Sequence, residues 1–135
     1  MHPFLDTRLH IGSRGDVLDP RKIYDSEIQA IIDLAAEEPP LHLRDIPYFR
    51  IPLHDDDSNP QELLQLALQT IQSCHHQHLK TLLVCSLGMS RSPALASTAI
   101  ALLTDESPAN LLSQYATNSP LDVSPSLWNS LLNLH

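Results

Sequence analysis

One stretch of the sequence, residues 84–93, constrains the fold more than any other part of the chain. An apolar run typical of a strand, residues 81–84, leads into it, and an alanine-rich run typical of a helix, residues 94–103, follows it. A loop that enters a helix N-terminus turns several backbone N–H groups inward, and the helix dipole adds partial positive charge there. The stretch therefore predicts a strand, a tight loop and a helix, with the loop forming a cradle for a dianion such as phosphate.

Three residues of this stretch supply the chemistry of the predicted cradle. Arg91, at its far rim, can place two N–H donors on phosphate oxygens in a fixed fork, which a lysine cannot do. Cys85 lies at the floor, where the inward N–H groups and Arg91 stabilise a thiolate, the nucleophilic form of cysteine. Gly88 provides the backbone freedom that a tight loop requires. The pattern predicts a cysteine nucleophile that is ready at neutral pH.

The order of these residues, Cys85-x-x-Gly88-x-x-Arg91-Ser92 after a strand, resembles the signature loop of a known enzyme family. The family is that of the cysteine-based protein tyrosine phosphatases, in its dual-specificity branch. The similarity extends upstream to about residue 8 and downstream to about residue 105. Beyond that point only the helical pattern is similar.

The resemblance implies a role for each residue of the loop. Cys85 is the nucleophile, Arg91 binds the phosphoryl group, and Ser92 donates a hydrogen bond to the thiolate. Capping of the helix N-terminus is the alternative role for Ser92. The remaining loop residues offer backbone N–H groups to the phosphate: Ser86, Leu87, Gly88, Met89 and Ser90.

The sequence offers one clear source of a general acid, the run Asp55-Asp56-Asp57. In the resembling family the acid follows a strand that ends in Ile-Pro, and it lies on a mobile loop before a helix. Asp55 matches that position best, because it comes directly after the sequence Ile-Pro-Leu-His at residues 51–54. Asp56 and Asp57 are the alternatives for this role. Such an acid protonates the leaving oxygen, which typically accelerates a reaction by about a hundred- to ten-thousand-fold.

The reaction that the resemblance implies is the two-step hydrolysis of a phosphomonoester through a phosphocysteine intermediate. The expected substrates are phosphoproteins, carrying phosphotyrosine and also phosphoserine or phosphothreonine, or small aryl phosphates. Polyphosphoinositides are disfavoured as substrates, because the loop carries no lysine and the chain is acidic. No cofactor is expected.

One residue departs from the family pattern. Many relatives carry a histidine immediately before the cysteine, where it helps to fix the loop, and this chain has Val84. The departure bears on how strongly the Cys85 thiolate is stabilised, and therefore on the rate. We expect an active enzyme of modest turnover.

Two other functions are compatible with parts of the motif. A phosphate-binding module that recognises phosphorylated partners without turnover needs the loop but no acid. The presence of Cys85, Arg91 and an acidic loop together disfavours it. A sulfur-transfer enzyme also uses a cysteine loop at a helix start, but Gly88 and the spacing to Arg91 fit it poorly.

The rest of the chain predicts an α/β fold with a central mixed, largely parallel sheet of four to five short strands flanked by helices. The phosphate-binding loop joins the last core strand to a buried helix. In the strand at residues 48–53, Phe49, Ile51 and Leu53 form the apolar face, and Pro52 indicates the end of the strand or an edge. The other expected strands lie at residues 9–13, 30–35 and 81–84. One helix is expected at residues 20–25, and four more are expected to begin at Pro60, residue 94, Pro108 and Pro125. Asn59 is the expected N-cap of the helix that begins at Pro60.

Two further groups of reactive side chains are assigned structural roles. Cys74 falls on the apolar face of the helix after Pro60, which favours a buried core residue over a reactive thiol. His75, His76 and His78 crowd the end of that helix without a second cluster nearby. We therefore expect exposed residues or partners of the helix dipole, and no metal site.

Length, charge and cysteine content limit the remaining possibilities. The 135 residues suffice for one catalytic domain, residues 1–135, with little room for added modules. A formal net charge of −8 disfavours nucleic acid and anionic membranes as partners. Two cysteines give no disulfide framework, which favours a reducing compartment. The sequence has no apolar segment long enough to span a membrane, and we expect a cytoplasmic protein. We also expect a monomer whose partner is its phosphorylated substrate.

Overall fold

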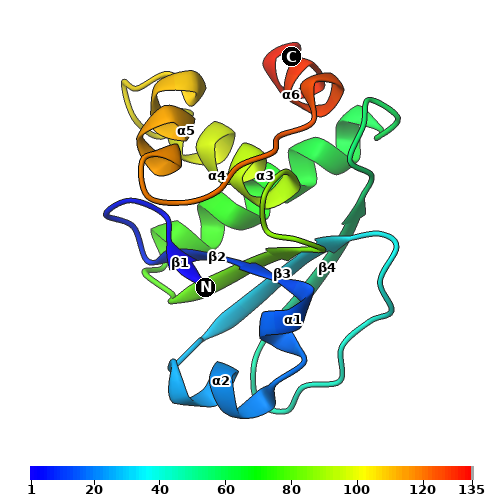
Figure 1. Ribbon diagram of the computed structural model, residues 1–135, viewed down its shortest axis with the longest axis vertical. Coiled ribbons are helices and arrows are strands. Elements are labelled where there is room, and N and C mark those ends of the chain that lie inside the picture. Colours follow the sequence, from blue (N-terminus) through cyan, green and yellow to red (C-terminus); the bar gives the residue numbers. More distant parts are fainter. Residues whose placement is uncertain (135) are drawn as a thin grey trace.

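The protein, described here as a computed structural model over residues 1–134, consists of five strands and six helices (Figure 1). The strands are β1 (His2–Pro3), β2 (Leu9–Ser13), β3 (Ala30–Ala35), β4 (Tyr48–Leu53) and β5 (Thr81–Cys85). The helices are α1 (Arg14–Val17), α2 (Pro20–Asp25), α3 (Gln61–His76), α4 (Arg91–Ala101), α5 (Pro108–Ala116) and α6 (Pro125–Leu132).

The strands form one sheet with the order β1-β2-β5-β3-β4. Only β1 runs antiparallel to its neighbour, and the other pairs are parallel. Helices α3 to α6 lie on one face of the sheet, and α1 and α2 lie on the other (Figure 1). This arrangement confirms the predicted mixed, largely parallel α/β sheet flanked by helices. It also shows a short first strand and a one-turn α1 that the sequence did not reveal.

The two central strands carry the continuous apolar runs. Every residue of β3 and of β5 is buried, as expected for strands that have a neighbour on each side and helices on both faces. In the parallel register Ser13 pairs with Cys85, and Asp33 pairs with Val84. The carboxyl ends of β2, β3 and β5 therefore meet at one edge of the sheet, and the loop that follows Cys85 begins there.

The outer strand β4 confirms one expectation and corrects another. It is the edge strand, as Pro52 indicated. Ile51 and Leu53 are buried, but Phe49, which was expected on the same apolar face, is 41 % exposed. Because β4 has a neighbouring strand on only one side, alternation along the strand does not ensure that its first residues are covered.

The main core lies between the sheet and helices α3 to α6. Every residue of α4 is buried, which confirms the prediction of a central buried helix. That helix begins at Arg91 and ends at Ala101, so Leu102 and Leu103 of the expected helical run lie beyond it and are exposed. Cys74 is buried as predicted, and Trp128 packs against this core. None of the helices within residues 1–134 has the length and apolarity needed to cross a bilayer.

The start of α3 differs from the expected cap. Pro60 is the N-cap, and Asn59 lies outside the helix. The Asn59 side chain instead accepts from the His54 backbone N–H (2.7 Å) and donates to the His54 carbonyl (2.8 Å). It therefore closes the acidic loop between β4 and α3. Helices α5 and α6 begin at Pro108 and Pro125 as predicted, and the hydroxyls of their N-caps, Ser107 and Ser124, each accept from a backbone N–H of the first turn.

Leu83 provides a test of the central strand as the anchor of the fold. Leu83→Ala removes a fully buried side chain from β5 and leaves a cavity. We expect the free energy of unfolding to fall by about 2–5 kcal/mol in a urea titration. The control Leu66→Ala removes a 49 % exposed side chain from α3 and should change it by less than about 0.5 kcal/mol. Equal losses for the two variants would contradict the assignment.

Candidate active site

The loop from Ser86 to Ser90 is built on a glycine and held from both sides. Gly88 has a φ of 75°, and a Cβ added to it would lie 3.0 Å from the Gly12 carbonyl oxygen. The Arg14 N–H donates to the Ser86 carbonyl (3.1 Å), and the Asp122 N–H donates to the Met89 carbonyl (2.9 Å). Within residues 1–134 the N–H groups of Leu87 to Ser90 donate to no backbone carbonyl. They remain available to an anion.

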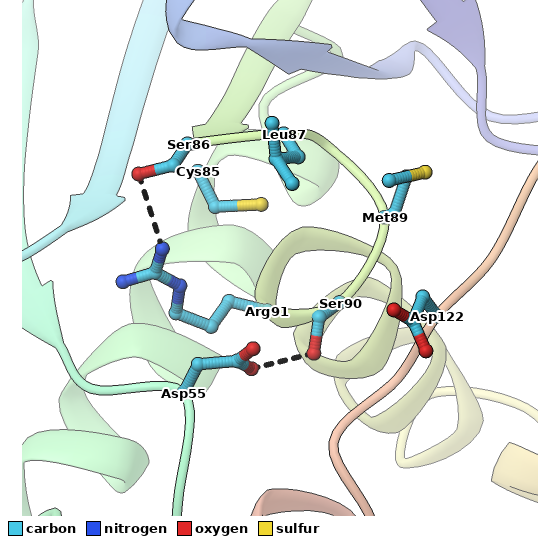
Figure 2. A pocket seen from close by; sticks show the side chains of 8 residues that line it. All are labelled: Asp55, Cys85, Ser86, Leu87, Met89, Ser90, Arg91 and Asp122. Carbon is cyan, nitrogen blue, oxygen red and sulfur yellow. Dashed lines mark hydrogen bonds between the residues drawn. The ribbon is translucent and has the colours of Figure 1, made fainter.

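The loop surrounds a pocket of about 120 Å³. Figure 2 shows the Cys85 side chain directed into its centre, with Arg91 on one side of it. The Cys85 residue is 2 % exposed and forms the floor, whereas Leu87 is 72 % exposed at the rim. The lining residues are Asp55, Cys85, Ser86, Leu87, Met89, Ser90, Arg91 and Asp122.

Arg91 is buried and held in one orientation. Its two terminal nitrogens bind the Glu37 carboxylate in a fork, with Nη1–Oε2 at 2.9 Å and Nη2–Oε1 at 2.5 Å. Nη1 also donates to the Leu53 carbonyl (2.8 Å), and Nη2 donates to the Ser86 hydroxyl (3.3 Å). The Nε–H donates to no residue within 1–134. The terminal N–H groups are thus directed to Glu37, Leu53 and Ser86, and the Nε–H is the donor that is left for an oxyanion. The two-donor fork that the sequence predicted on phosphate is made to the Glu37 carboxylate in this structure.

Glu37 is the main functional residue that the sequence reasoning missed. It follows the buried strand β3, and its carboxylate also accepts a short hydrogen bond from the Ser86 hydroxyl. The hydrogen bond from Arg91 is the main reason why the pKa of Glu37 falls to about 2 from its ordinary value near 4.5. The available signal was its place after a parallel strand, at the sheet edge where Cys85 also lies.

A buried carboxylate supports the turn that carries Glu37. Asp33 is fully buried and accepts from the Tyr48 hydroxyl (2.5 Å) and from Arg50 Nη1 (3.3 Å). Arg50 Nη2 then donates to the Glu38 carbonyl (2.6 Å). The guanidinium of Arg50 thus ties β3, β4 and the turn between them, which presents Glu37 to Arg91.

Of the three consecutive aspartates, only Asp55 lines the pocket. The Ser90 hydroxyl donates to Asp55 Oδ1 (2.5 Å) and accepts from the Ser124 N–H (2.9 Å), which orients the hydroxyl proton toward the carboxylate (Figure 2). The Asp56 carboxylate is turned to Ser58, accepting from its N–H and its hydroxyl. The structure therefore places Asp55 in the same pocket as Cys85, and its role as an acid stays a prediction.

Ser92 does not make the contacts expected of it. It is fully buried in the first turn of α4, and its hydroxyl has no hydrogen-bond partner within residues 1–134. The N-cap position is occupied by Ser90, so the alternative capping role of Ser92 is wrong. Its proposed hydrogen bond to the thiolate is not made in this structure and remains a prediction for the ionised form.

Asp122 is a second lining residue that the sequence reasoning missed. It lies between α5 and α6, beyond the part of the chain that resembles the family. Figure 2 shows it beyond Ser90, on the side away from Arg91. No local pattern in the sequence links it to the loop, because the link is a tertiary contact between the Asp122 N–H and the Met89 carbonyl.

These features define the class of site: a cysteine at the floor of an anion-sized pocket, at the N-terminus of a buried helix, beside a fixed guanidinium. The sequence matches the family described as dual specificity phosphatase, catalytic domain, over residues 9–105. The chain belongs to this family. Membership confirms the resemblance drawn from the loop and assigns the chain to the protein phosphatases as a class.

Solved structures share the fold. Human DUSP28 superimposes with a TM-score of 0.79 at 18 % identity, covering 95 % of this chain and 91 % of that one. For DUSP15 the TM-score is 0.83 at 24 % identity, with 97 % and 84 % covered. PTPMT1 in complex with PI(5)P gives 0.74 at 16 % identity, with 94 % and 89 % covered. No curated protein sequence matched the chain.

The Glu37–Arg91 pair predicts a specific loss of stability in acid. Because the folded-state pKa of Glu37 is depressed to about 2, its contribution is fully present above the ordinary value near 4.5 and is lost as the pH falls toward 2. We expect Glu37→Gln to be less stable than the wild type at pH 6, with the gap in unfolding free energy narrowing below pH 4.5.

Urea titrations at pH 6, 4 and 3 measure this gap. The carboxylate is about half exposed, so solvent screening keeps the effect modest. The control is Glu27→Gln, at an exposed glutamate in the turn after α2. The difference in unfolding free energy between this variant and the wild type should not show the same change with pH. A Glu37→Gln gap that is the same at all three pH values would show that the ion pair contributes nothing.

Proposed function

We propose that this chain is a cysteine-dependent protein phosphatase that works through a phosphocysteine intermediate. The observation that carries the proposal is the convergence of Cys85, Arg91 and Asp55 on one pocket of about 120 Å³. A nucleophile, an oxyanion-binding group and a proton donor are the three groups that the reaction requires. Membership of the dual specificity phosphatase family supports the same reaction.

In the first step the Cys85 thiolate attacks phosphorus. The S–P bond forms while the P–O bond to the leaving group breaks, and Asp55 gives its proton to the departing oxygen. The non-bridging phosphoryl oxygens lie among the loop N–H groups that have no backbone acceptor within residues 1–134, and against the Nε–H of Arg91. These donors are fixed before the substrate arrives, so they stabilise the transition state without reorganisation.

In the second step water attacks the phosphocysteine. The Asp55 carboxylate takes a proton from the water, the new P–O bond forms, and the S–P bond breaks to return the thiolate. The Ser92 hydroxyl, which is buried and has no hydrogen-bond partner among residues 1–134, is the group expected to donate to that thiolate. Inorganic phosphate then leaves through the open side of the pocket, past the exposed Leu87.

The proposed substrates are phosphoproteins. Phosphotyrosine is expected together with phosphoserine and phosphothreonine, because the rim residues Asp55, Leu87 and Asp122 are exposed and the pocket is small. PTPMT1 was crystallised with a phosphoinositide, but the loop of this chain carries no lysine to match such a headgroup. A cytoplasmic location is proposed on chemical grounds, because the free thiol of Cys85 needs a reducing compartment.

The nucleophile is tested by Cys85→Ser. We expect hydrolysis of 4-nitrophenyl phosphate to fall by at least about a thousandfold, because the hydroxyl is a much weaker nucleophile than a thiolate. Binding of inorganic phosphate, measured by calorimetry, should persist. The matched control is Cys74→Ser, the same change at the other free cysteine, which is buried on α3 and should keep its activity.

Two outcomes separate the alternatives. Turnover by Cys85→Ser at the wild-type rate would exclude the phosphocysteine mechanism. Phosphate binding by a wild-type protein that hydrolyses neither aryl phosphates nor phosphopeptides would identify a phosphate-binding module in place of an enzyme.

The acid is tested by its dependence on the leaving group. Asp55→Asn keeps the hydrogen bond from Ser90 but removes the transferable proton. We expect turnover of phenyl phosphate, a poor leaving group, to fall by about a hundred- to ten-thousand-fold, and that of 4-nitrophenyl phosphate to fall much less. Asp56→Asn and Asp57→Asn are the matched controls. A larger effect from either control would reassign the acid.

A further inference from the structure

The pocket has an unusual balance of charge for a site that binds a dianion. Of the residues that line it, Arg91 is the one cation, whereas Asp55 and Asp122 carry carboxylates. The Arg91 charge is also paired with Glu37 through two hydrogen bonds. The rim therefore repels a substrate that brings further negative charge close to its phosphate.

Asp122 is the rim charge that the proposed reaction does not use. The proposed reaction requires Asp55 to give a proton to the leaving group, so that step uses Asp55 as a neutral carboxyl group. Asp122 is exposed, and within residues 1–134 its carboxylate makes no hydrogen bond and no ion pair. It is therefore a free negative charge that a positive group of the substrate can approach.

The position of Asp122 at the rim is fixed by its backbone. The Asp122 N–H donates to the Met89 carbonyl (2.9 Å), and two residues later the Ser124 N–H donates to the Ser90 hydroxyl (2.9 Å). These bonds hold the segment between α5 and α6 against the phosphate-binding loop. The Asp122 carboxylate thus lies beside the pocket, on a segment that is hydrogen-bonded to the phosphate-binding loop (Figure 2).

We propose that Asp122 makes the site select phosphopeptides with lysine or arginine next to the phosphorylated residue. The inference rests on the proposed function, and it names the substrate class of that same pocket. The phosphate group binds in the cradle, and the cationic side chain of a neighbouring residue reaches the Asp122 carboxylate. Acidic flanks, and headgroups with several phosphates, are disfavoured by the same charge.

The test compares phosphotyrosine peptides that differ only in flanking charge. Three peptides carry lysine, alanine or glutamate on both sides of the phosphotyrosine, and kcat/KM is measured from phosphate release at low salt. The wild type should prefer the lysine peptide over the glutamate peptide. Asp122→Asn should lower that ratio by about two- to fivefold, the size of an exposed ion pair, and Asp122→Lys should lower it further. High salt should reduce the preference, because it screens exposed charges.

A matched control separates this local effect from the net charge of the protein. Asp105→Asn removes the same charge from an exposed residue beyond the C-terminal end of α4, whereas the pocket lies at its N-terminal end. Its lysine-to-glutamate ratio should equal that of the wild type. An equal fall in the ratio for Asp105→Asn and Asp122→Asn, or no fall for either, would overturn the proposal.

Binding measurements keep the test independent of turnover. Fluorescently labelled forms of the three peptides are titrated with Cys85→Ser and with Cys85→Ser/Asp122→Asn, after thermal unfolding has shown that both are folded. Loss of the lysine preference in the double variant supports the proposal even if the wild type hydrolyses neither these peptides nor an aryl phosphate, the outcome that would identify a phosphate-binding module in place of an enzyme. The same preference in both proteins would exclude a role for Asp122.

Discussion

The site depends on the burial of one guanidinium. Arg91 is 5 % exposed, and a cation in such a place needs acceptors in fixed directions. Three segments that follow or end parallel strands supply them: Glu37 after β3, the Leu53 carbonyl at the end of β4, and Ser86 after β5. The parallel sheet brings these segments together, because the carboxyl ends of its strands lie at one edge. The parallel arrangement of the strands therefore determines both the fold and the position of the phosphate site.

The loop is held by contacts that leave its inner surface free. Its carbonyls at Ser86 and Met89 accept from the N–H groups of Arg14 and Asp122, which belong to segments on either side of it. Gly88 lets the chain turn close to the backbone of Gly12. The outward carbonyls are thus satisfied within the protein, whereas the inward N–H groups are left for a ligand. The contacts that hold the loop are therefore separate from the groups that an anion would use.

Local patterns in the sequence sufficed for the elements and for the loop, but they did not reveal how distant segments pair. The strand, loop and helix at residues 81–101 were predictable because apolar runs, Gly88 and Arg91 act over short separations. Glu37 and Asp122 were not, because each reaches the loop through a tertiary contact. Phe49 and Asn59 were misread for a related reason: the neighbours of the edge strand and of the acidic loop, rather than local pattern or capping preference, decide their environment.

The residue before the nucleophile is a valine, and other residues hold the loop. Val84 is buried among apolar side chains on the α1 and α2 side of the sheet, so it offers the loop no hydrogen bond of the kind that a histidine would offer there. The ordering of the loop then falls to Ser86, whose hydroxyl links Glu37 with Arg91 and whose carbonyl accepts from Arg14. The carboxylate of Glu37 and the hydroxyl of Ser86 are the side-chain groups that link the start of the loop to Arg91. The anion site is thereby ordered by groups that stay in one protonation state at neutral pH, since the pKa of Glu37 lies near 2.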